Sequence, residues 1–312
     1  MQNICDFDSL VQCLRSMPRR RRVAVACPGD THTEYVIRRA LEEQTADFLL
    51  VCGGPAAWDV EGLCSVHPGR AEIVAAQTPD EAARMAVESV REGRADVLMK
   101  GSINTDNLLR AVLDKEHGLL LPGSVMSHLT AIEAPDYPKL LFATDVAVIP
   151  RPTLEQFDAM VRHAVAVCRC LGIAAPRVAL VHCTEKVSEK FPHTLSYMEL
   201  ERRAAAGAYG DAVLGGPMDV KTACDAESGL VKGISSPVAG QADVLVFPGI
   251  EAGNTFYKTM SLFGHARMAG MLCGTTAPVV LSSRADTGES KYASLALACV
   301  TAAMANKNGT GQ

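Results

Sequence analysis

A serine and an arginine near the end of the chain stand where their side chains could together bind an oxyanion. Ser283 and Arg284 directly follow a short apolar run that is typical of a buried strand, and Asp286 or Thr287 can cap the helix that comes next. A hydroxyl, a guanidinium and the amino end of a helix favour a bound phosphate. The alternative interpretation is structural: Asp286 and Glu289 form a capping box and Arg284 lies in solvent.

A second polar loop contains Lys100 and Gly101 and joins another predicted strand to a helix. Gly101 allows a ligand or another backbone to approach closely, and Asn104 or Thr105 can cap the helix. The loop is not a P-loop, because the chain contains no G-x-x-x-x-G-K-[ST], and it contains no G-x-G-x-x-G fingerprint after a strand. A Lys-Gly turn with a purely structural role is the alternative.

Three further segments supply candidate binding residues. His128 lies in a Met-Ser-His-Leu segment, Thr144 and Asp145 follow an apolar run, and Asn254 and Lys258 lie in a polar segment interpreted as a loop. Taken alone, His128 is more typical of a hydrogen-bonded core histidine than of a catalyst. Neither G-x-S-x-G nor H-E-x-x-H occurs, so the sequence does not support a serine hydrolase or a zinc peptidase.

Short apolar runs alternate with helical periodicity from one end of the chain to the other, which predicts an α/β fold with mostly parallel sheets. The runs are continuous, as expected for strands covered on both faces. The predicted strands are Arg22–Cys27, Phe48–Cys52, Asp96–Met99, Leu140–Ala143, Arg177–His182, Val244–Phe247, Ala269–Cys273 and Val279–Ser282. Capping patterns mark helix starts at Thr78 and Thr153. Because ligands bind at the carboxyl ends of parallel strands, the polar loops are expected to face that edge.

Two prolines in the segment 149–152 interrupt the alternation of predicted strands and helices and so predict a hinge. A second point at which the chain passes between the two domains is predicted near residues 274–278. We therefore expect a first αβα domain made of residues 1–150 and 277–312, an inserted αβα domain made of residues 151–276, and an active-site cleft between them.

The composition excludes several classes of protein. The 312 residues are 48% hydrophobic and 21% charged, which is ordinary for a globular chain, and the net charge of -5 argues against a nucleic-acid surface but not against a local phosphate site. The eleven cysteines are scattered without zinc-ligand spacing, which indicates reduced thiols in the cytoplasm. Neither an export signal nor an apolar stretch long enough to cross a membrane is evident.

Taken together, these segments resemble the phosphate acetyl/butyryl transferase family. The matching blocks follow the family's order along most of the chain. They are Leu98–Gly101 with Thr105 and Leu108–Asp114, Ser127–His128, Thr144–Ala147 with Pro150, Gly216–Pro217, Lys232–Ile234, Ala239–Asp243, Glu251–Asn254 with Tyr257–Lys258, and Pro278–Asp286. The length and the Ser-Arg-Ala-Asp segment are more similar to phosphate butyryltransferases than to the acetyl-specific branch.

The resemblance implies an acyltransferase that moves a short acyl group, butyryl or a similar chain, between coenzyme A and phosphate by direct attack of phosphate on the thioester. It also implies a two-domain, three-layer αβα fold shared with isocitrate and isopropylmalate dehydrogenases, and a homodimer or higher homo-oligomer. The expected partners are acyl-CoA and phosphate, with no metal, no tightly bound cofactor, no nucleic acid and no membrane.

The resemblance also implies roles for individual residues. Ser283 and Arg284 match the family's Ser-Arg pair, which is expected to bind phosphate and the developing charge. Acetyl-specific members have a proposed catalytic aspartate where this chain has Ser290, so either Asp286 or Glu289 is expected to act as the base, or proton transfer is arranged differently. The expected substrate-binding residues are Lys100, Gly101, Thr105, His128, Thr144, Asp145, Asn254 and Lys258.

Three other functions stay open at this point. The first is a phosphate acetyltransferase, and the second is a metal- and NAD-dependent dehydrogenase of the same fold. Asp145 and Glu251 are isolated candidate metal ligands for such a dehydrogenase, without a cluster around them. The third is a non-catalytic protein that binds coenzyme A, which Ser290 in place of an aspartate would suggest.

Overall fold

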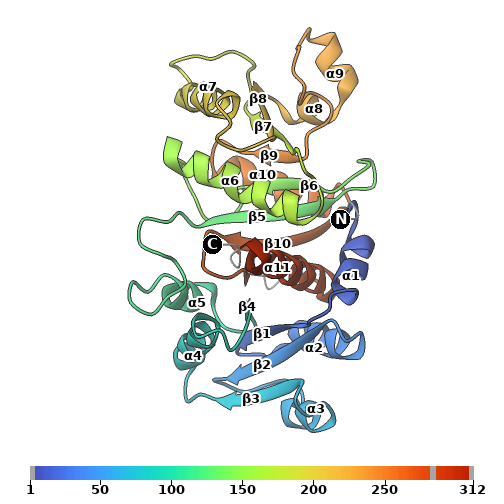
Figure 1. The fold of residues 1–312 in the computed structure, drawn as a ribbon, viewed down its shortest axis with the longest axis vertical. Helices are drawn as coiled ribbons and strands as arrows, with labels where there is room; N and C mark the ends of the chain where they lie inside the picture. Colours follow the sequence, from blue (N-terminus) through green and yellow to red (C-terminus); the bar gives the residue numbers. More distant parts are fainter. Residues whose placement is uncertain (1–3, 282–285, 309–312) are drawn as a thin grey trace. The chain divides into compact units, whose positions relative to one another are not determined.

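The computed structural model describes residues 4–281 and 286–308 (Figure 1). The chain divides into two compact units. Unit 1 contains the residues up to 7 together with 127–268, and unit 2 contains residues 8–126 together with those from 269 onwards. Each unit is built on a mostly parallel sheet with helices on both faces, so the predicted α/β class is confirmed.

Unit 2 contains the strands in the spatial order β3-β2-β1-β4-β11-β10. They are β1 (Arg21–Ala26), β2 (Ala46–Cys52), β3 (Ala71–Ala75), β4 (Val97–Lys100), β10 (Arg267–Cys273) and β11 (Val279–Val280). Neighbours from β3 to β11 are parallel, whereas β10 runs antiparallel to β11. The carboxyl ends of the parallel strands therefore share one edge.

Helices cover both faces of this sheet. They are α1 (Phe7–Arg15), α2 (Thr31–Glu42), α3 (Val60–Val66), α4 (Pro79–Arg91), α5 (Thr105–Val112) and α11 (Gly288–Asn308). The helices α4 and α5 pack against each other on one face, and α2 packs against α11 on the other (Figure 1).

Unit 1 contains the strands in the order β5-β6-β9-β7-β8. They are β5 (Ser127–Glu133), β6 (Leu141–Thr144), β7 (Arg177–Val181), β8 (Val213–Met218) and β9 (Val244–Val246). The helices are α6 (Leu154–Cys170), α7 (Pro192–Ala205), α8 (Val220–Cys224), α9 (Ala226–Val231) and α10 (Ile250–Leu262). Side chains of α8 and α10 join one buried apolar cluster with the sheet, while α6 and α7 pack on the other face.

The boundaries of the units differ from the predicted domain boundaries. They fall at 126/127 and 268/269 rather than at the proline-rich segment and near residue 276, so residues 127–150 belong with the inserted segment. The physical reason is strand pairing: β6 pairs with β9 from Phe142↔Val244 to Thr144↔Val246. The cleft predicted between the domains stays a prediction.

Every predicted strand overlaps an observed strand, but the patterns do not reveal β3, β5 and β8. The strands β3 and β8 end their spatial orders, and β8 contains Gly-Gly-Pro, which disfavours a strand away from a sheet edge. Polar Ser, His and Thr interrupt β5. The caps predicted at Thr78 and Thr153 are confirmed, because Thr78 caps α4 and Thr153 forms a capping box with Gln156 at the start of α6. Asn104 occupies the N-cap position of α5 but makes no side-chain capping hydrogen bond. No helix within the described residues is long and apolar enough to cross a membrane.

Candidate functional site

In unit 2, the loops that follow β1 and β4 are packed against each other at the carboxyl edge of the sheet. A β-carbon at Gly101 would lie only 2.0 Å from the carbonyl oxygen of Cys27, so this position requires glycine. The same oxygen accepts hydrogen bonds from the amides of Gly29 and Ser102 at 2.8 and 2.7 Å, and from the Ser102 hydroxyl at 3.0 Å. The close approach predicted at Gly101 is therefore an approach to the neighbouring backbone.

Lys100 places a buried positive charge beside this contact. It is the last residue of β4, its side chain is buried, and its Nζ donates to the carbonyl oxygen of Gly101 at 3.2 Å. A buried ammonium is stable only where acceptors or anions surround it. Thr105 is the first residue of α5 and is exposed, one residue after the N-cap Asn104. Lys100, Gly101 and Thr105 thus lie at one end of β4, as predicted.

The carboxylates predicted as possible bases lie near the start of α11, where Asp286 precedes the helix and Glu289 belongs to its first turn. Ser283 and Arg284 lie outside the described residues. The hydroxyl of Thr287 accepts a hydrogen bond from the Ser290 amide at 3.2 Å and so caps α11. The Glu289 carboxylate forms an ion pair with Arg39, with 2.6 Å between Oε2 and Nη1, and its Oε1 accepts a hydrogen bond from the Tyr35 hydroxyl. Glu289 is therefore held on α2.

In unit 1, the antiparallel pairing of β5 with β6 brings His128 and Asp145 together. The register pairs Thr130 with Ala143, and its continuation places His128 opposite Asp145. The His128 amide donates to Asp145 Oδ2 at 2.7 Å. The His128 side chain is buried, with Nδ1 3.3 Å from the Thr130 hydroxyl, which agrees with a hydrogen-bonded core histidine.

The Asp145 carboxylate organises the turn that follows β6. Its Oδ1 accepts hydrogen bonds from the amides of Ala147 and Val148 at 2.8 and 2.7 Å, in addition to the bond from His128. Asp145 is only 1% exposed. Three amide donors share the two carboxylate oxygens, so this side chain fixes backbone positions.

Helix α10 packs directly on this turn. A β-carbon at Gly253 would lie 2.2 Å from the carbonyl oxygen of Asp145, and the Asn254 side-chain amide donates to the Val146 carbonyl at 2.9 Å. Lys258 lies one turn further along α10 and is exposed. The structure therefore brings His128, Asp145 and Asn254 together, while Lys258 extends from the same helix.

Two polar groups beside Asp145 add to the site. The Thr144 hydroxyl is buried and has no hydrogen-bond partner among the described residues. The Ser127 hydroxyl lies 2.8 Å from Nδ1 of His163 on α6. Burial lowers the pKa of His163, although the nearby charge of Asp145 opposes the shift, so this imidazole is neutral at pH 7. His163 was not a sequence candidate, because the pattern of α6 reveals only its apolar face.

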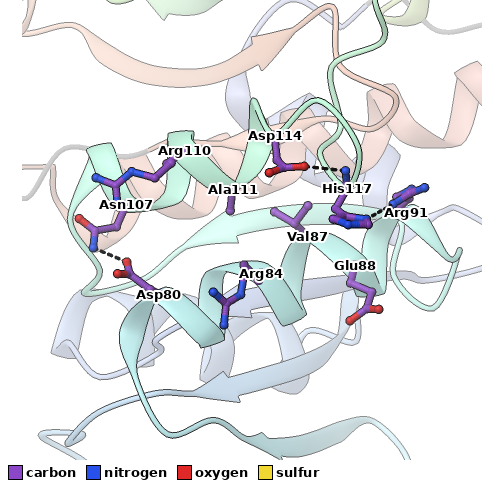
Figure 2. Close-up of a pocket in the computed structure, with 10 residues that line it drawn as sticks. All are labelled: Asp80, Arg84, Val87, Glu88, Arg91, Asn107, Arg110, Ala111, Asp114 and His117. Carbon is purple, nitrogen blue, oxygen red and sulfur yellow. Dashed lines mark hydrogen bonds between the residues drawn. The ribbon is translucent and has the colours of Figure 1, made fainter.

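The helices α4 and α5 border a groove that the sequence analysis did not identify (Figure 2). The cavity has a volume of about 460 Å³ and an apolar floor formed by Val87 and Ala111. At one end Asp80 and Asn107 are hydrogen bonded, and at the other end Arg91 Nη1 lies 3.1 Å from Nδ1 of His117.

Two arginines line this groove: Arg110 lies beside Asn107 at one end, and Arg84 lies between Asp80 and Glu88 (Figure 2). Arg84 comes from α4 and Arg110 from α5, and both are exposed. Neither guanidinium forms an ion pair or a hydrogen bond within the part of the chain that the structure describes. Because α5 begins where the Lys100 loop ends, the Asn107 end of the groove lies next to that loop. Asp80, Glu88 and Asp114 also line the groove, so the two guanidinium groups would offer positive charge to a bound anion within a lining of mixed charge.

Comparison with known proteins identifies the family. A family model described as "Phosphate acetyl/butaryl transferase" matches residues 66–299. The chain belongs to this family. It is 36% identical over 298 residues to the phosphate butyryltransferase of Clostridium beijerinckii, covering 96% of this chain and 98% of that protein. It is 35% identical over 298 residues to the phosphate acetyltransferase of Thermotoga maritima, covering 95% and 99%.

A solved structure of this family agrees with the fold. The branched-chain phosphotransacylase from Enterococcus faecalis V583 is 31% identical in sequence to the present chain. The comparison covers 90% of the present chain and 99% of that structure, with a TM-score of 0.80. The predicted resemblance and the predicted enzyme class, an acyltransferase acting on acyl-CoA and phosphate, are confirmed. Within residues 4–281 and 286–308, no three His, Cys, Asp or Glu side chains are grouped to hold a metal.

Replacing Asp145 with asparagine tests whether its carboxylate organises the turn after β6. Asp145→Asn leaves one oxygen for three amide donors and turns an NH₂ group toward one of them. The free energy of unfolding should fall by about 1–3 kcal/mol, and turnover should fall with it. Denaturant unfolding measures the loss, with Asp136→Asn on an exposed loop as the control. A stability equal to that of the control would contradict this role.

Proposed function

We propose that this family member transfers butyryl or a similar short acyl group between coenzyme A and inorganic phosphate, by direct attack of a phosphate oxygen on the thioester carbonyl. The observation that carries the proposal is the match to phosphate acyltransferases along almost the whole chain, together with a buried lysine in the matching Lys100-Gly101 loop. Coenzyme A is then a substrate rather than a bound cofactor.

Ser283 and Arg284 are proposed to bind phosphate. Two observations on neighbouring residues support this role: α11 begins at the carboxyl edge shared by β4 and β11, and the buried Lys100 ammonium lies at the end of β4. Attack of phosphate places negative charge on the thioester oxygen, and cations fixed beforehand stabilise that charge without reorganisation.

Asp286 and Glu289 both stay proposed as the base. Glu289 forms an ion pair with Arg39 through one oxygen and accepts a hydrogen bond from Tyr35 through the other, which also suits a positioning role. In the direction that forms acyl-CoA, a base near the sulfur generates the thiolate, which is the nucleophilic form.

The residues of unit 1 are proposed to contact the acyl-CoA. Thr144 offers the clearest support, because a buried hydroxyl without a partner in the described chain costs free energy unless a ligand or water satisfies it. Asp145 and Asn254 hold the turn that presents Thr144, while His128 lines the same position from β5. Lys258 is the proposed cationic contact on α10.

The groove between α4 and α5 is proposed to bind the phosphorylated nucleotide end of coenzyme A. Arg84 and Arg110 supply guanidinium groups without carboxylate partners in the described chain, and the floor of Val87 and Ala111 suits an apolar ring face. The groove leads from the Lys100 loop along α5, so an elongated thioester could extend from one to the other.

The relationship to a dehydrogenase fold, the oligomeric state and the cellular location are also proposals. The shared architecture with isocitrate and isopropylmalate dehydrogenases is supported by parallel sheets covered on both faces. A homodimer or larger assembly is supported by strongly exposed apolar side chains on α9 and at the end of α10, namely Leu230, Val231, Leu262 and Phe263. A cytoplasmic location is supported by eleven free thiols.

The proposed reaction requires phosphate, which gives the first test. Butyryl-CoA should lose its thioester only when phosphate is present, and acetyl-CoA should react more slowly. Loss of thioester absorbance is the suitable readout, because exposed Cys5 and Cys183 would react with a thiol reagent. Equal rates with and without phosphate would indicate a hydrolase, and binding without turnover would indicate a non-catalytic protein.

Arg284 variants test the proposed phosphate contact. Arg284→Ala should lower turnover by roughly 100-fold, the usual scale for losing a charge-stabilising donor. Arg284→Lys keeps the charge but loses the two-point geometry, so it should raise the KM for phosphate and recover only part of the rate. Near-normal turnover of Arg284→Ala at saturating phosphate would contradict the assignment, and a lowered thermal midpoint instead would support a structural role.

The proposed role of the groove predicts that the effect of groove variants on KM depends on whether the substrate carries the nucleotide. Arg84→Ala and Arg110→Ala should each raise the KM for butyryl-CoA by about tenfold, the effect of one lost charge-assisted hydrogen bond. With a butyryl-pantetheine thioester, which lacks the nucleotide, both variants should match the unaltered protein. Arg94→Ala is the matched control, since Arg94 pairs with Glu92 outside the groove. An equal loss with both thioesters would exclude the groove as the nucleotide site.

A further inference from the structure

A polar cavity lies at the edge of the unit 2 sheet where the parallel strands begin, opposite the edge that carries the Lys100 loop. Its volume is about 740 Å³. Its lining comes from the ends of α1 and α2, the starts of β1 and β2 and the turn before β3, and it includes the arginines Arg15, Arg19, Arg20 and Arg22. The proposed acyl transfer uses no residue of this edge.

A carboxylate at this edge, Asp47, holds two arginines at different depths. Its Oδ1 accepts from Nε of Arg70 at 3.0 Å and from Nε of Arg20 at 3.1 Å. The Arg70 side chain is half-buried and also donates to the Leu41 carbonyl at the end of α2, at 2.7 Å. The Arg20 side chain is exposed and lines the cavity. Arg70 already neutralises Asp47, so Arg20 adds a positive charge that the carboxylate does not require.

Asp96, which directly precedes β4, repeats this arrangement. Its Oδ1 lies 3.4 Å from Nη1 of Arg21 and 3.6 Å from Nη2 of Arg19. The Arg21 side chain is 11% exposed, whereas the Arg19 side chain is 70% exposed and lines the cavity. The deeper arginine again neutralises the carboxylate, and the outer arginine extends into the cavity.

Glu43, at the end of α2, is the third carboxylate with two arginines. Its Oε1 lies 2.9 Å from Nε of the half-buried Arg39, and its Oε2 lies 2.9 Å from Nη2 of the exposed Arg15. Three exposed arginines therefore line one cavity, and each is attached to a carboxylate that a deeper arginine also holds. We call Arg15, Arg19 and Arg20 the outer arginines.

The charges at this edge do not cancel. The three carboxylates and Glu289, which also pairs with Arg39, face the three outer and the three deeper arginines, so two positive charges are in excess. The adjacent Arg22–Glu72 pair is neutral, and Glu42 on the lining reduces the excess to one. Because the whole chain has a net charge of -5, this is a local positive site on an acidic protein.

The outer arginines keep most of their hydrogen-bond donors. Arg20 contacts its carboxylate through Nε, and Arg15 and Arg19 each do so through Nη2. None of the three donates to a backbone carbonyl within residues 4–281 and 286–308, so they do not stabilise a helix end as Arg70 does. A guanidinium has five N–H donors, and the contact with a carboxylate restricts its orientation. Each outer arginine can therefore present several oriented N–H groups to a ligand.

The spacing of these groups around a cavity of this size indicates the class of ligand. A guanidinium binds two oxygens of a phosphate group in one plane. A single small anion would occupy only part of the cavity, whereas a chain of phosphate groups offers oxyanions to several arginines at once. An oligophosphate therefore fits the outer arginines better than a monovalent anion does.

We propose that this cavity binds an oligophosphate, a di- or triphosphate chain that is either free or carried by a nucleotide, through Arg15, Arg19 and Arg20. The deeper arginines keep the carboxylates neutralised, so the outer arginines can turn their free N–H groups to the ligand. The site lies on the opposite edge of the sheet from the Lys100 loop, and its ligand is not consumed in the proposed acyl transfer.

Titration calorimetry of the whole protein with inorganic tripolyphosphate, at low ionic strength and without acyl-CoA or orthophosphate, tests the site. Arg19→Ala and Arg20→Ala should each raise the Kd by about tenfold, the effect of one lost charge-assisted hydrogen bond. Arg19→Lys and Arg20→Lys keep the charge without the planar fork and should recover part of the affinity. Added salt should weaken binding, because the outer arginines are exposed.

Arg202→Ala is the matched control, because the Arg202 side chain is 71% exposed and pairs with Glu199 in unit 1. It should leave the Kd for tripolyphosphate unchanged. If Arg19→Ala and Arg20→Ala bind as this control does, or if the unaltered protein binds no tripolyphosphate, the inference is wrong. Loss of binding in Arg84→Ala or Arg110→Ala instead would place the ligand in the groove between α4 and α5 and would also overturn it.

The thermal midpoint of each variant checks the fold, and it should change little because a deeper arginine stays on each carboxylate. Should an alanine variant not fold, the lysine variants decide by the same Kd values.

Further ligands separate the possible sources of the phosphate chain. A nucleoside triphosphate should bind at least as tightly as tripolyphosphate, and the nucleoside alone should not bind. Tighter binding of the nucleotide would identify it as the ligand, whereas equal binding would show that the free chain suffices. Orthophosphate binding as tightly as tripolyphosphate, or binding of an oligonucleotide without tripolyphosphate, would overturn the inference. The proposed function fails on a different measurement, the absence of phosphate-dependent turnover.

Discussion

The carbonyl oxygen of Cys27 is the contact on which the candidate site of unit 2 depends. It receives the amides of Gly29 and Ser102 and the Ser102 hydroxyl, and it lies so close to Gly101 that no other residue type fits there. Two loops from different strands are thereby locked together through backbone atoms. The Lys100 ammonium at the end of β4 is then held by a rigid base, which is what preorganised stabilisation of a phosphate and of a developing oxyanion requires.

The candidate site of unit 1 is built on the same principle with a side chain in place of a carbonyl. The Asp145 carboxylate collects three amides, and Gly253 lets α10 approach the carbonyl oxygen of the same residue. Asp145 in unit 1 and Lys100 in unit 2 are both candidate functional residues in the sequence. In the structure, the side chains of both residues form hydrogen bonds with the backbone. Thr144 is the contrast, since its buried hydroxyl finds no partner in the described chain. An architecture of this kind separates the groups that fix geometry from the groups that are proposed to contact substrate.

The sequence predicts the fold class, most strands and two helix caps because these depend on local patterns: apolar runs, capping residues and the alternation of strand and helix. It predicts the loops of Lys100 and Asp145 because polar residues after buried strands are themselves a local signal. It does not predict β5, whose polar residues become buried only by pairing with β6, nor the unit boundary, which is decided by the pairing of β6 with β9 rather than by prolines. The roles of Glu289 and His163 are likewise invisible, since each depends on a partner far away in sequence.

In the proposed function, the Arg84–Arg110 groove allows one helix to link the two ends of a long substrate. Helix α5 starts at the Lys100 loop, where a phosphate would react, and its next turns supply Asn107, Arg110 and Ala111 to the groove. An α-helix advances about 1.5 Å per residue. A single rigid helix can therefore set the distance between the reacting end and the charged end of an elongated thioester. The locked Cys27 contact fixes the start of α5, and the packing of α5 on α4 fixes its course. Binding energy gained in the groove can then be used to place the thioester carbonyl beside the phosphate, because the two sites cannot move independently of each other.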